Sequence, residues 1–320
     1  MKKVPVFILT GFLGSGKTTL LKRFLDECLQ KKLTAAVLMN EMGETDTDGK
    51  SVSSKNQIIE KLLDGCICCN KKSEVTQSIE KLLTLEPDVI FIELTGVANP
   101  EEVADSLTEP ELLHRVYLEK VITLIDAEHI LSYNSMFESD RELVRTTRRQ
   151  IEVADMQIVN KVDLVSEGIR SKINKLLVKY NPAATISYVN YSNIDVTKLF
   201  TFSNANRVTV KIKGTKQESN HHTNHHSHSR INSISLPLLS MTTKRDIETF
   251  LKKWKSNLLR AKGYVLLDDG TYLIQQVMKR LSWERTDYTG EHYLVLIGID
   301  LQKEEILKDW QRVIQKTKAF

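Results

Sequence analysis

No stretch of this 320-residue chain stays apolar over the roughly 18 residues that a helix needs to cross a bilayer. The apolar run near the N-terminus is also short, and we therefore expect a cytoplasmic protein. An excess of one charge is lacking as well, because 45 basic and 41 acidic residues are mixed along the chain and leave a net charge of +4. With charges so balanced, the net charge gives no reason to expect nucleic acid or a membrane surface as a partner.

Cysteine is scarce too, with four in the whole chain. Cys28 lies in a predicted helix, whereas Cys66, Cys68 and Cys69 stand together in one short segment. So few thiols, arranged in this way, favour thiolate or metal chemistry over a disulfide framework. No solenoid repeat is present, and the length, with 41% hydrophobic and 27% charged residues, predicts two ordinary globular domains.

The strongest motif is Gly-Phe-Leu-Gly-Ser-Gly-Lys-Thr at residues 11–18, which fits the phosphate-binding template of Gly, four residues and Gly-Lys-Thr. It follows an apolar, β-rich run at residues 4–9 and precedes an amphipathic helix predicted from Lys17 to about Lys31. Glycines allow the backbone to turn its N–H groups toward phosphate oxygens. The predicted nucleotide-binding residues of this loop are Gly11, Gly14, Ser15, Gly16, Lys17, Thr18 and Thr19.

Two side chains of the motif have predicted tasks in catalysis. Lys17 would bridge the β- and γ-phosphates, and the Thr18 hydroxyl would take one coordination position of Mg²⁺. The positive end of the helix dipole adds to the attraction for phosphate.

The rest of the first domain predicts a doubly wound, mostly parallel α/β sheet. Buried strands are expected at residues 34–39, 88–93, 120–126, 156–159 and 184–189, and helices at 54–63, 73–85, 167–179 and, briefly, 195–200. Polar residues follow several strands at their carboxyl ends, where such sheets bind ligands. Glu93 to Gly96 has the pattern of a Walker B strand with a γ-phosphate-sensing turn, so we add Glu93 and Gly96 to the catalytic residues.

Asn160-Lys161-Val162-Asp163 follows another strand. The Asp163 carboxylate can accept from the ring N–H and the exocyclic amine of guanine, an arrangement that adenine does not present. This predicts GTP as the nucleotide.

Past residue 212 the composition changes. Residues 213–230 form a polar linker with His221, His222, His225, His226 and His228, which is either a metal-collecting arm or a solvated spacer. Residues 231–320 predict a small α+β domain. Its expected strands are 231–238, 262–267, 272–278 and 293–299, and its expected helices are 243–258 and 303–316.

The segment Gly65-Cys66-Ile67-Cys68-Cys69 offers two or three soft ligands, one short of a closed tetrahedral site. Such an incomplete site suits the delivery of Zn²⁺, Cu(I) or another thiophilic ion. Buried core cysteines and a dithiol redox site remain alternatives.

These motifs, together with Asn40-Glu41-Met42-Gly43-Glu44, occur in an order that resembles the CobW-type GTPases, relatives of UreG and HypB. The resemblance covers most of the chain and implies a GTP-hydrolysing metallochaperone. It implies guanine contacts for Asn160, Lys161 and Asp163, and metal contacts for Cys66, Cys68, Cys69, Glu41 and Glu44. Met42 and Asn70-Lys71-Lys72 depart from the family pattern.

The predicted function is therefore delivery of a metal ion, under control of GTP or GDP, to a client metalloprotein. Zn²⁺ is the expected cargo, with Co²⁺ and Fe²⁺ open, and Mg²⁺ accompanies the nucleotide. Homodimer formation is left open. The rival hypotheses are an ATP-dependent kinase of a small molecule and a nucleotide-regulated metal buffer without turnover.

Overall fold

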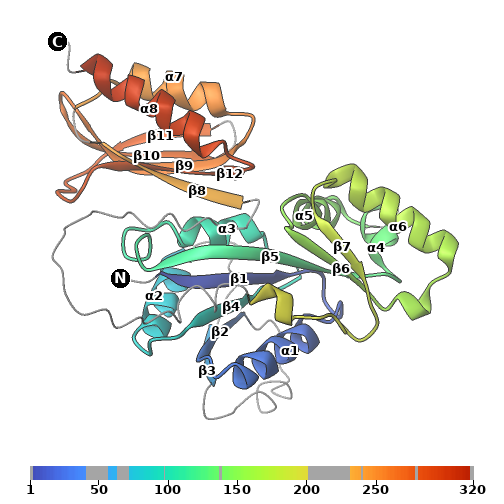
Figure 1. The fold of residues 1–320 in the computed structure, drawn as a ribbon. Coiled ribbons are helices and arrows are strands. Elements are labelled where there is room, and N and C mark those ends of the chain that lie inside the picture. The colour runs from blue at the N-terminus through green and yellow to red at the C-terminus, as the bar shows by residue number, and fades with distance from the viewer. Residues whose placement is uncertain are drawn as a thin grey trace, which may run out of the picture.

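The structure is a computed structural model that describes residues 3–40, 57–62, 72–96, 98–136, 139–200, 231–238, 241–277 and 280–317. It contains two sheets, each covered by helices (Figure 1). None of the helices in these ranges is long and apolar enough to cross a membrane.

The first sheet has seven parallel strands in the order β3-β2-β4-β1-β5-β6-β7. The strands are β1 (Val4–Thr10), β2 (Ala35–Asn40), β3 (Gln57–Leu62), β4 (Val89–Glu93), β5 (Val116–Asp126), β6 (Met156–Asn160) and β7 (Thr185–Tyr188). The helices between them are α1 (Lys17–Gln30), α2 (Lys72–Leu83), α3 (Pro100–Ser106), α4 (Ile130–Tyr133), α5 (Arg141–Glu152) and α6 (Glu167–Tyr180). Short 3₁₀ helices follow at η2 (Val162–Leu164) and η3 (Thr197–Leu199).

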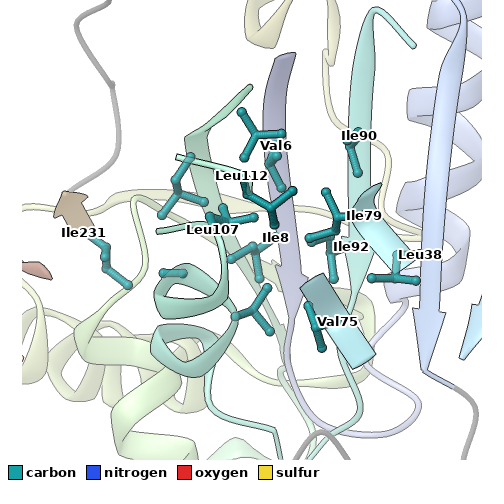
Figure 2. Close-up of a cluster of buried hydrophobic side chains, with 14 of the residues drawn as sticks. Val6, Ile8, Leu38, Val75, Ile79, Ile90, Ile92, Leu107, Leu112 and Ile231 are labelled. Atoms are coloured by element: carbon teal, nitrogen blue, oxygen red, sulfur yellow. The ribbon is translucent and has the colours of Figure 1, made fainter. Parts of the chain in front are cut away.

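Alternation along the buried strands gives the sheet two apolar faces. Val6 and Ile8 point toward α2 and α3, as Figure 2 shows, whereas Phe7 and Leu9 point toward α1. Phe200, at the end of the first domain, packs on the α1 face with its ring 6.4 Å from that of Phe7. Helices on both faces confirm the doubly wound α/β fold that was predicted from the sequence.

β1 lies between β4 and β5, so the chain adds strands on one side of β1 and then crosses to the other side. In open α/β sheets ligands bind beside the carboxyl ends of the strands at such a change of direction. The loop at residues 11–18 leaves β1 at this point.

One predicted helix is wrong, because residues 57–62 of the segment 54–63 form strand β3. The apolar pairs of this segment fit helical spacing and strand spacing almost equally, and such short runs are ambiguous. β-Branched Ile58 and Ile59 favour a strand, and pairing with Ala36 and Val37 of β2 decides it.

Other elements were missed or shifted. No helix was predicted for the stretches that form α3, α4 and α5, and no strand was predicted for β11. The helix expected at 243–258 ends at Trp254, and β9 begins at Leu258 rather than Lys262. The predicted linker at 213–230 lies outside the described residues.

The second sheet has five strands in the order β11-β10-β9-β12-β8, with every pair antiparallel. Its elements are β8 (Ile231–Pro237), α7 (Lys244–Trp254), β9 (Leu258–Leu267), β10 (Gly270–Val277), β11 (Arg280–Arg285), β12 (Tyr293–Ile299) and α8 (Lys303–Thr317). α7 and α8 bury one face of this sheet around Trp310 and Phe250. This is the small α+β domain that was expected.

The opposite face of the second sheet packs against the first domain. Ile231, Val295 and Ile297 belong to the same buried cluster as Leu107 and Leu112 near α3. Figure 2 shows Ile231 beside this cluster. Ion pairs border the apolar contact, with Lys262 Nζ 2.7 Å from a Glu109 carboxylate oxygen. The two sheets therefore share a continuous core, which holds the second domain against α3 and β5.

Candidate functional site

The loop between β1 and α1 requires glycine at defined positions. Gly11, Gly14 and Gly16 have φ values of 128°, 75° and 107°, in the left-handed region that glycine tolerates. A Cβ on Gly11 would lie 2.1 Å from the Leu124 carbonyl oxygen, and one on Gly16 would lie 2.5 Å from Asn160 Nδ2. The loop is thus folded closely against β5 and β6.

Lys17 lies over this loop as the first residue of α1. Its ammonium donates to the carbonyl oxygens of Gly11 at 2.8 Å and Phe12 at 3.1 Å. Burial lowers the pKa of Lys17 below its ordinary value, and the nearby Glu93 carboxylate opposes that shift. A poorly solvated positive charge at the N-terminus of a helix suits a phosphate ligand.

The side chains of Thr18, at the start of α1, and Glu93, at the end of β4, are in contact. β4 pairs with β1 so that Glu93 lies opposite Leu9, and the Thr18 hydroxyl donates to Glu93 Oε1 at 3.1 Å. Both offer oxygen atoms, and Glu93 is 8% exposed. Oxygen donors beside a phosphate loop are the ligands that Mg²⁺ prefers, so these residues fit the metal that was predicted with the nucleotide.

The other predicted loop residues differ in exposure. Thr19 is exposed on the first turn of α1, whereas Ser15 is fully buried. The Ser15 hydroxyl has no hydrogen-bond partner within the described part of the chain.

Gly96, on the turn after β4, abuts the phosphate loop, because a Cβ on it would lie 2.9 Å from the Leu13 amide nitrogen. Gln150 of α5 holds this turn by donating to the carbonyl oxygens of Gly96 at 3.0 Å and Ala98 at 3.2 Å. Sequence reasoning missed Gln150, since no local motif marks a helix residue that contacts a distant turn.

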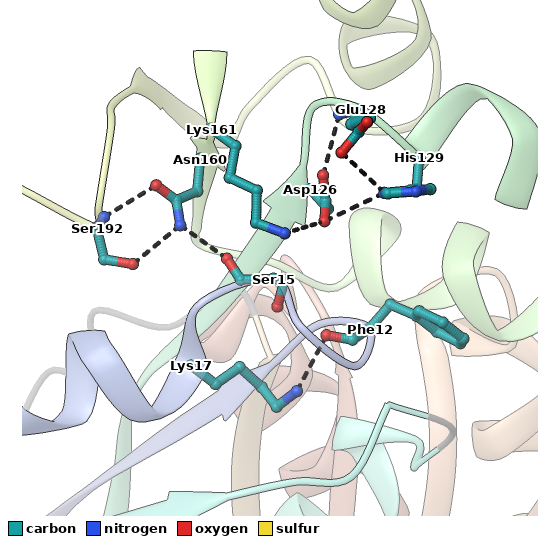
Figure 3. Close-up of polar contacts among 9 residues, drawn as sticks. All are labelled: Phe12, Ser15, Lys17, Asp126, Glu128, His129, Asn160, Lys161 and Ser192. Atoms are coloured by element: carbon teal, nitrogen blue, oxygen red, sulfur yellow. Dashed lines mark hydrogen bonds and ion pairs between the residues drawn. The ribbon is translucent and has the colours of Figure 1, made fainter. Parts of the chain in front are cut away.

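Asn160, predicted to contact guanine, braces the phosphate loop (Figure 3). Its Nδ2 donates to the Ser15 carbonyl at 2.9 Å, and its Oδ1 accepts from the Ser192 amide at 2.9 Å. The Ser192 hydroxyl donates in turn to the Gly16 carbonyl at 3.1 Å. Ser192 was not predicted, and its buried position after β7 is visible only in the fold.

Lys161 points toward the end of β5. Its ammonium lies 2.6 Å from Asp126 Oδ2, which is also 3.3 Å from His129 Nδ1 (Figure 3). Asp126, Glu128 and His129 offer ligand atoms within 4.8 Å of one another, yet the Lys161 ammonium already neutralises Asp126. We interpret this group as a charge network that holds Lys161. Asp126 was not among the predicted site residues, although an acid at the end of a predicted strand is a signal that could have indicated it.

Asp163 lies on η2 just beyond Lys161, and its amide donates to Asn190 Oδ1 at 3.0 Å. Its side chain is exposed, and its carboxylate makes no hydrogen bond or ion pair to any residue within the described ranges. The carboxylate is thus accessible to a ligand at the edge of the sheet where the phosphate loop lies.

Glu41, Glu44, Cys66, Cys68 and Cys69 lie outside the described residues. The strand ends from which their segments leave are described. Asn40 at the end of β2 is the register partner of Leu62 at the end of β3, and Met39 is the partner of Glu93. The end of β2 therefore lies next to Glu93 and the end of β3 lies one strand further out, both at the edge that carries the phosphate loop.

The loop between β1 and α1 can surround an anion with N–H groups while Thr18 and Glu93 offer oxygen ligands beside it, and this defines a P-loop nucleotide-binding protein. Residues 5–188 match the family described as CobW/HypB/UreG, nucleotide-binding domain, and residues 231–314 match the cobalamin synthesis protein cobW C-terminal domain. The chain belongs to the CobW/HypB/UreG family, as its motifs indicated.

Individual relatives agree with this assignment. The chain is 31% identical over 325 residues to the zinc chaperone YjiA of Escherichia coli, covering 96% of this chain and 97% of that one. It is 34% identical to the zinc-regulated GTPase metalloprotein activator 1 of Schizosaccharomyces pombe, covering 68% of this chain and 54% of the relative. A Zn(II)-bound triple mutant of the E. coli YjiA GTPase aligns with a TM-score of 0.50 and 26% identity, covering 98% of this chain and 99% of that one.

Proposed function

We propose that this chain is a GTP-hydrolysing metallochaperone that holds a thiophilic metal ion and passes it to a client metalloprotein under control of the nucleotide. The observation that carries the proposal is the register of β2, β3 and β4. Glu41 and Cys66 follow β2 and β3 in the sequence, and these strands end at the same sheet edge as Glu93, with β2 next to β4 and β3 beyond it. The names of the relatives, which are zinc chaperones and GTPases, support the same function.

The phosphate loop performs the first part of this function. Lys17 and the loop N–H groups would stabilise the negative charge that develops on the γ-phosphate during hydrolysis. Thr18 and Glu93 would hold Mg²⁺, which when bound neutralises charge on the β- and γ-phosphates. The turn at Gly96 lies against the loop, at the place where an attacking water would be positioned.

Guanine recognition would rest on the residues after β6. Asp163 presents its carboxylate at the sheet edge and would accept from the ring N–H and the exocyclic amine of guanine. Asn160 would act mainly by fixing the phosphate loop, since its amide group is already bonded to Ser15 and Ser192. Lys161, held by Asp126, would border the base site.

Metal binding would use Cys66, Cys68 and Cys69, with Glu41 and Glu44 as further candidate ligands. Thiolates favour Zn²⁺ among the divalent ions that a cell supplies, and Co²⁺ and Fe²⁺ fit the same residue types less specifically. Because β2 and β3 both end at the sheet edge that carries Glu93, a change at the γ-phosphate would have a short path to the metal site. We place this cycle in the cytoplasm, with the client protein as partner.

The experiment is to measure Zn²⁺ affinity of the full chain with a non-hydrolysable GTP analogue and with GDP. We expect the affinities to differ at least fivefold, because linkage requires a difference if the nucleotide controls the metal. The variant with Ser at positions 66, 68 and 69 should lose this binding, whereas Cys28→Ala, a thiol change in the core of α1, should keep it. Equal affinities with both nucleotides would refute control by the nucleotide.

Two further results would favour other functions. Preference for ATP over GTP in a competition assay would point to a kinase, and Asp163→Ala should then leave the nucleotide preference unchanged. Absence of GTP turnover with every metal tested would point to a metal buffer. A doubled mass with the GTP analogue would add a homodimer to the cycle.

A further inference from the structure

A cleft with a volume of about 640 Å³ lies between the two domains, away from the phosphate loop. α3 and α5 of the first domain form two of its walls, and Leu259 and Arg260 of β9 form the third. Clefts between domains are common binding sites, because the residues of two separately folded units meet there.

Most acidic groups of the cleft are already engaged. Arg149 pairs with Glu101 at 2.7 Å and with Glu152 at 3.0 Å, while Arg260 lies 3.7 Å from Glu102. Burial lowers the pKa of Arg149, but its ion pairs outweigh this and raise the pKa above the ordinary value. These pairs stabilise the walls, and Glu142, which is exposed next to Arg141, is the one glutamate of the cleft without an ion pair in the described part of the chain.

The arginines of α5 are less completely balanced. Arg141 and Arg145 lie one helical turn apart, are exposed, and form no ion pair or hydrogen bond with any residue in the described ranges. Arg148 donates only to uncharged acceptors of Asn134, at 2.8 and 3.2 Å. One wall of the cleft thus presents guanidinium groups in a row.

Apolar side chains lie next to this row. Leu259 lines the cleft and is half-buried, Met136 at its border is 51% exposed, and Val144 beneath them is buried. A compact phosphate would meet the carboxylates of Glu101 and Glu152 as well as the arginines. A peptide can place separate carboxylates on separate guanidinium groups and an apolar side chain between them.

We propose that this cleft binds a short acidic segment of the client protein, with carboxylates on Arg141 and Arg145 and an apolar side chain against Met136 and Leu259. The segment would thereby contact both domains. Electrostatic attraction by α5 would speed encounter, and the apolar contact would slow release.

The cleft is connected to the phosphate site through α5. Gln150, on the same helix as Arg145, donates to the carbonyl oxygens of Gly96 and Ala98 on the turn beside the phosphate loop. A nucleotide that shifts this turn would shift α5, so the peptide and the nucleotide should change each other's affinity. This coupling and the choice of the client as the source of the segment rest on the proposed function, whereas the binding of an acidic peptide by the cleft does not.

The test uses the full chain and a fluorescein-labelled peptide of six residues in which Glu and Leu alternate, followed by fluorescence anisotropy. We expect Arg141→Glu/Arg145→Glu to weaken binding at least tenfold. The matched control is Lys172→Glu/Lys175→Glu, which makes the same charge change on exposed positions of α6 and should alter binding less than twofold. Thermal unfolding and Zn²⁺ affinity of both variants should equal those of the unchanged chain.

Two outcomes would overturn the docking proposal. One is equal binding of the acidic peptide and a peptide with Gln in place of Glu, and the other is equal loss of binding in both double variants. The coupling is tested by repeating the titration with GTP analogue and with GDP. An affinity difference of at least threefold is expected, and equal affinities would overturn the coupling while leaving the docking result intact.

Discussion

The two sheets of this protein use the same secondary structure in different ways. In the parallel sheet neighbouring strands end at one edge, so Glu93, Asp126 and Asn160, which are distant in sequence, lie around the loop that follows β1. In the antiparallel sheet neighbouring strands end at opposite edges, and no such gathering of strand ends can occur. One face of the antiparallel sheet packs against α7 and α8, and the other packs against the region of α3.

This comparison predicts that single substitutions at the carboxyl edge of the parallel sheet abolish nucleotide binding or hydrolysis. Substitutions on the faces of the antiparallel sheet should instead weaken the contact between the domains. The largest expected effect is that of Lys17→Ala, which removes the charged group over the phosphate loop. GTP turnover should fall about 100- to 1000-fold, as expected for loss of one electrostatic group in an active site. Lys22→Ala on the same helix is the control and should turn over normally. Turnover of Lys17→Ala within tenfold of the unchanged chain would contradict this role.

A glycine in the loop after β1 and a glycine in β9 allow the edge of the first sheet to be compared with the interior of the second. Gly11→Ala would place a Cβ 2.1 Å from the Leu124 carbonyl oxygen, and Gly263→Ala would place one 2.0 Å from the Tyr293 carbonyl oxygen. Each should lower the free energy of unfolding by about 3 kcal/mol, but we expect Gly11→Ala alone to abolish nucleotide binding.

Gly14→Ala is the control for this pair. Its φ of 75° is also positive, but a Cβ there would meet nothing within 4 Å. It should cost about 1 to 2 kcal/mol from backbone strain. Urea unfolding and binding of a fluorescent GDP measure both quantities, and loss of GDP binding in Gly263→Ala would show that the contrast between edge and face is wrong.

The ion pairs at the domain contact predict a smaller effect. Arg260→Ala removes the guanidinium that lies 2.8 Å from the buried carboxylate of Asp105, which should lower the free energy of unfolding by about 2 kcal/mol. Arg280→Ala, at an exposed position of β11, should change it by less than about 0.5 kcal/mol. Urea unfolding compares them, and equal stabilities would show that the apolar contact alone holds the domains together.

Glu102→Gln should have the smallest effect and the opposite sign. Burial raises the pKa of the Glu102 carboxyl, and Asn99 and Arg260 offset this only in part. A raised pKa favours folding at pH values below the ordinary pKa, and this contribution is lost as the pH rises through the folded-state pKa. At pH 7 the ionised carboxylate therefore costs stability, and Glu102→Gln should be as stable as the unchanged chain or more stable by up to about 0.5 kcal/mol. Its advantage should shrink as the pH falls toward 4, and a less stable variant at pH 7 would contradict this.

The features that could be predicted from the sequence are those whose residues are close together in the chain. The phosphate loop could be identified because its glycines, Lys17 and Thr18 are contiguous and its strand and helix flank it directly. Glu93 could be placed because an apolar strand that ends in an acid is itself a pattern. β3 was assigned wrongly because its apolar residues fit two periods, and only the neighbouring strand β2 decides between them.

Contacts between distant elements were beyond the sequence. Gln150 on Gly96, Ser192 on Gly16 and Lys161 on Asp126 each join segments whose meeting depends on strand order. The interdomain cleft is of the same kind, since α5 and β9 were not predicted to be neighbours. The roles of Cys66, Cys68 and Cys69 stay predictions from the motif.

The two anchoring points at the domain junction have a consequence for assembly. Phe200 is fixed in the aromatic cluster on the α1 face of the parallel sheet, whereas Ile231 is fixed in the cluster on the opposite face. Residues 201–230 join these two points in the sequence. If most of them were deleted, the second domain could reach its place only on another copy, and we expect an exchanged dimer whose mass is twice that of the monomer. On this account, the length of residues 201–230 determines whether the second domain packs against the first domain of its own chain or against that of another copy.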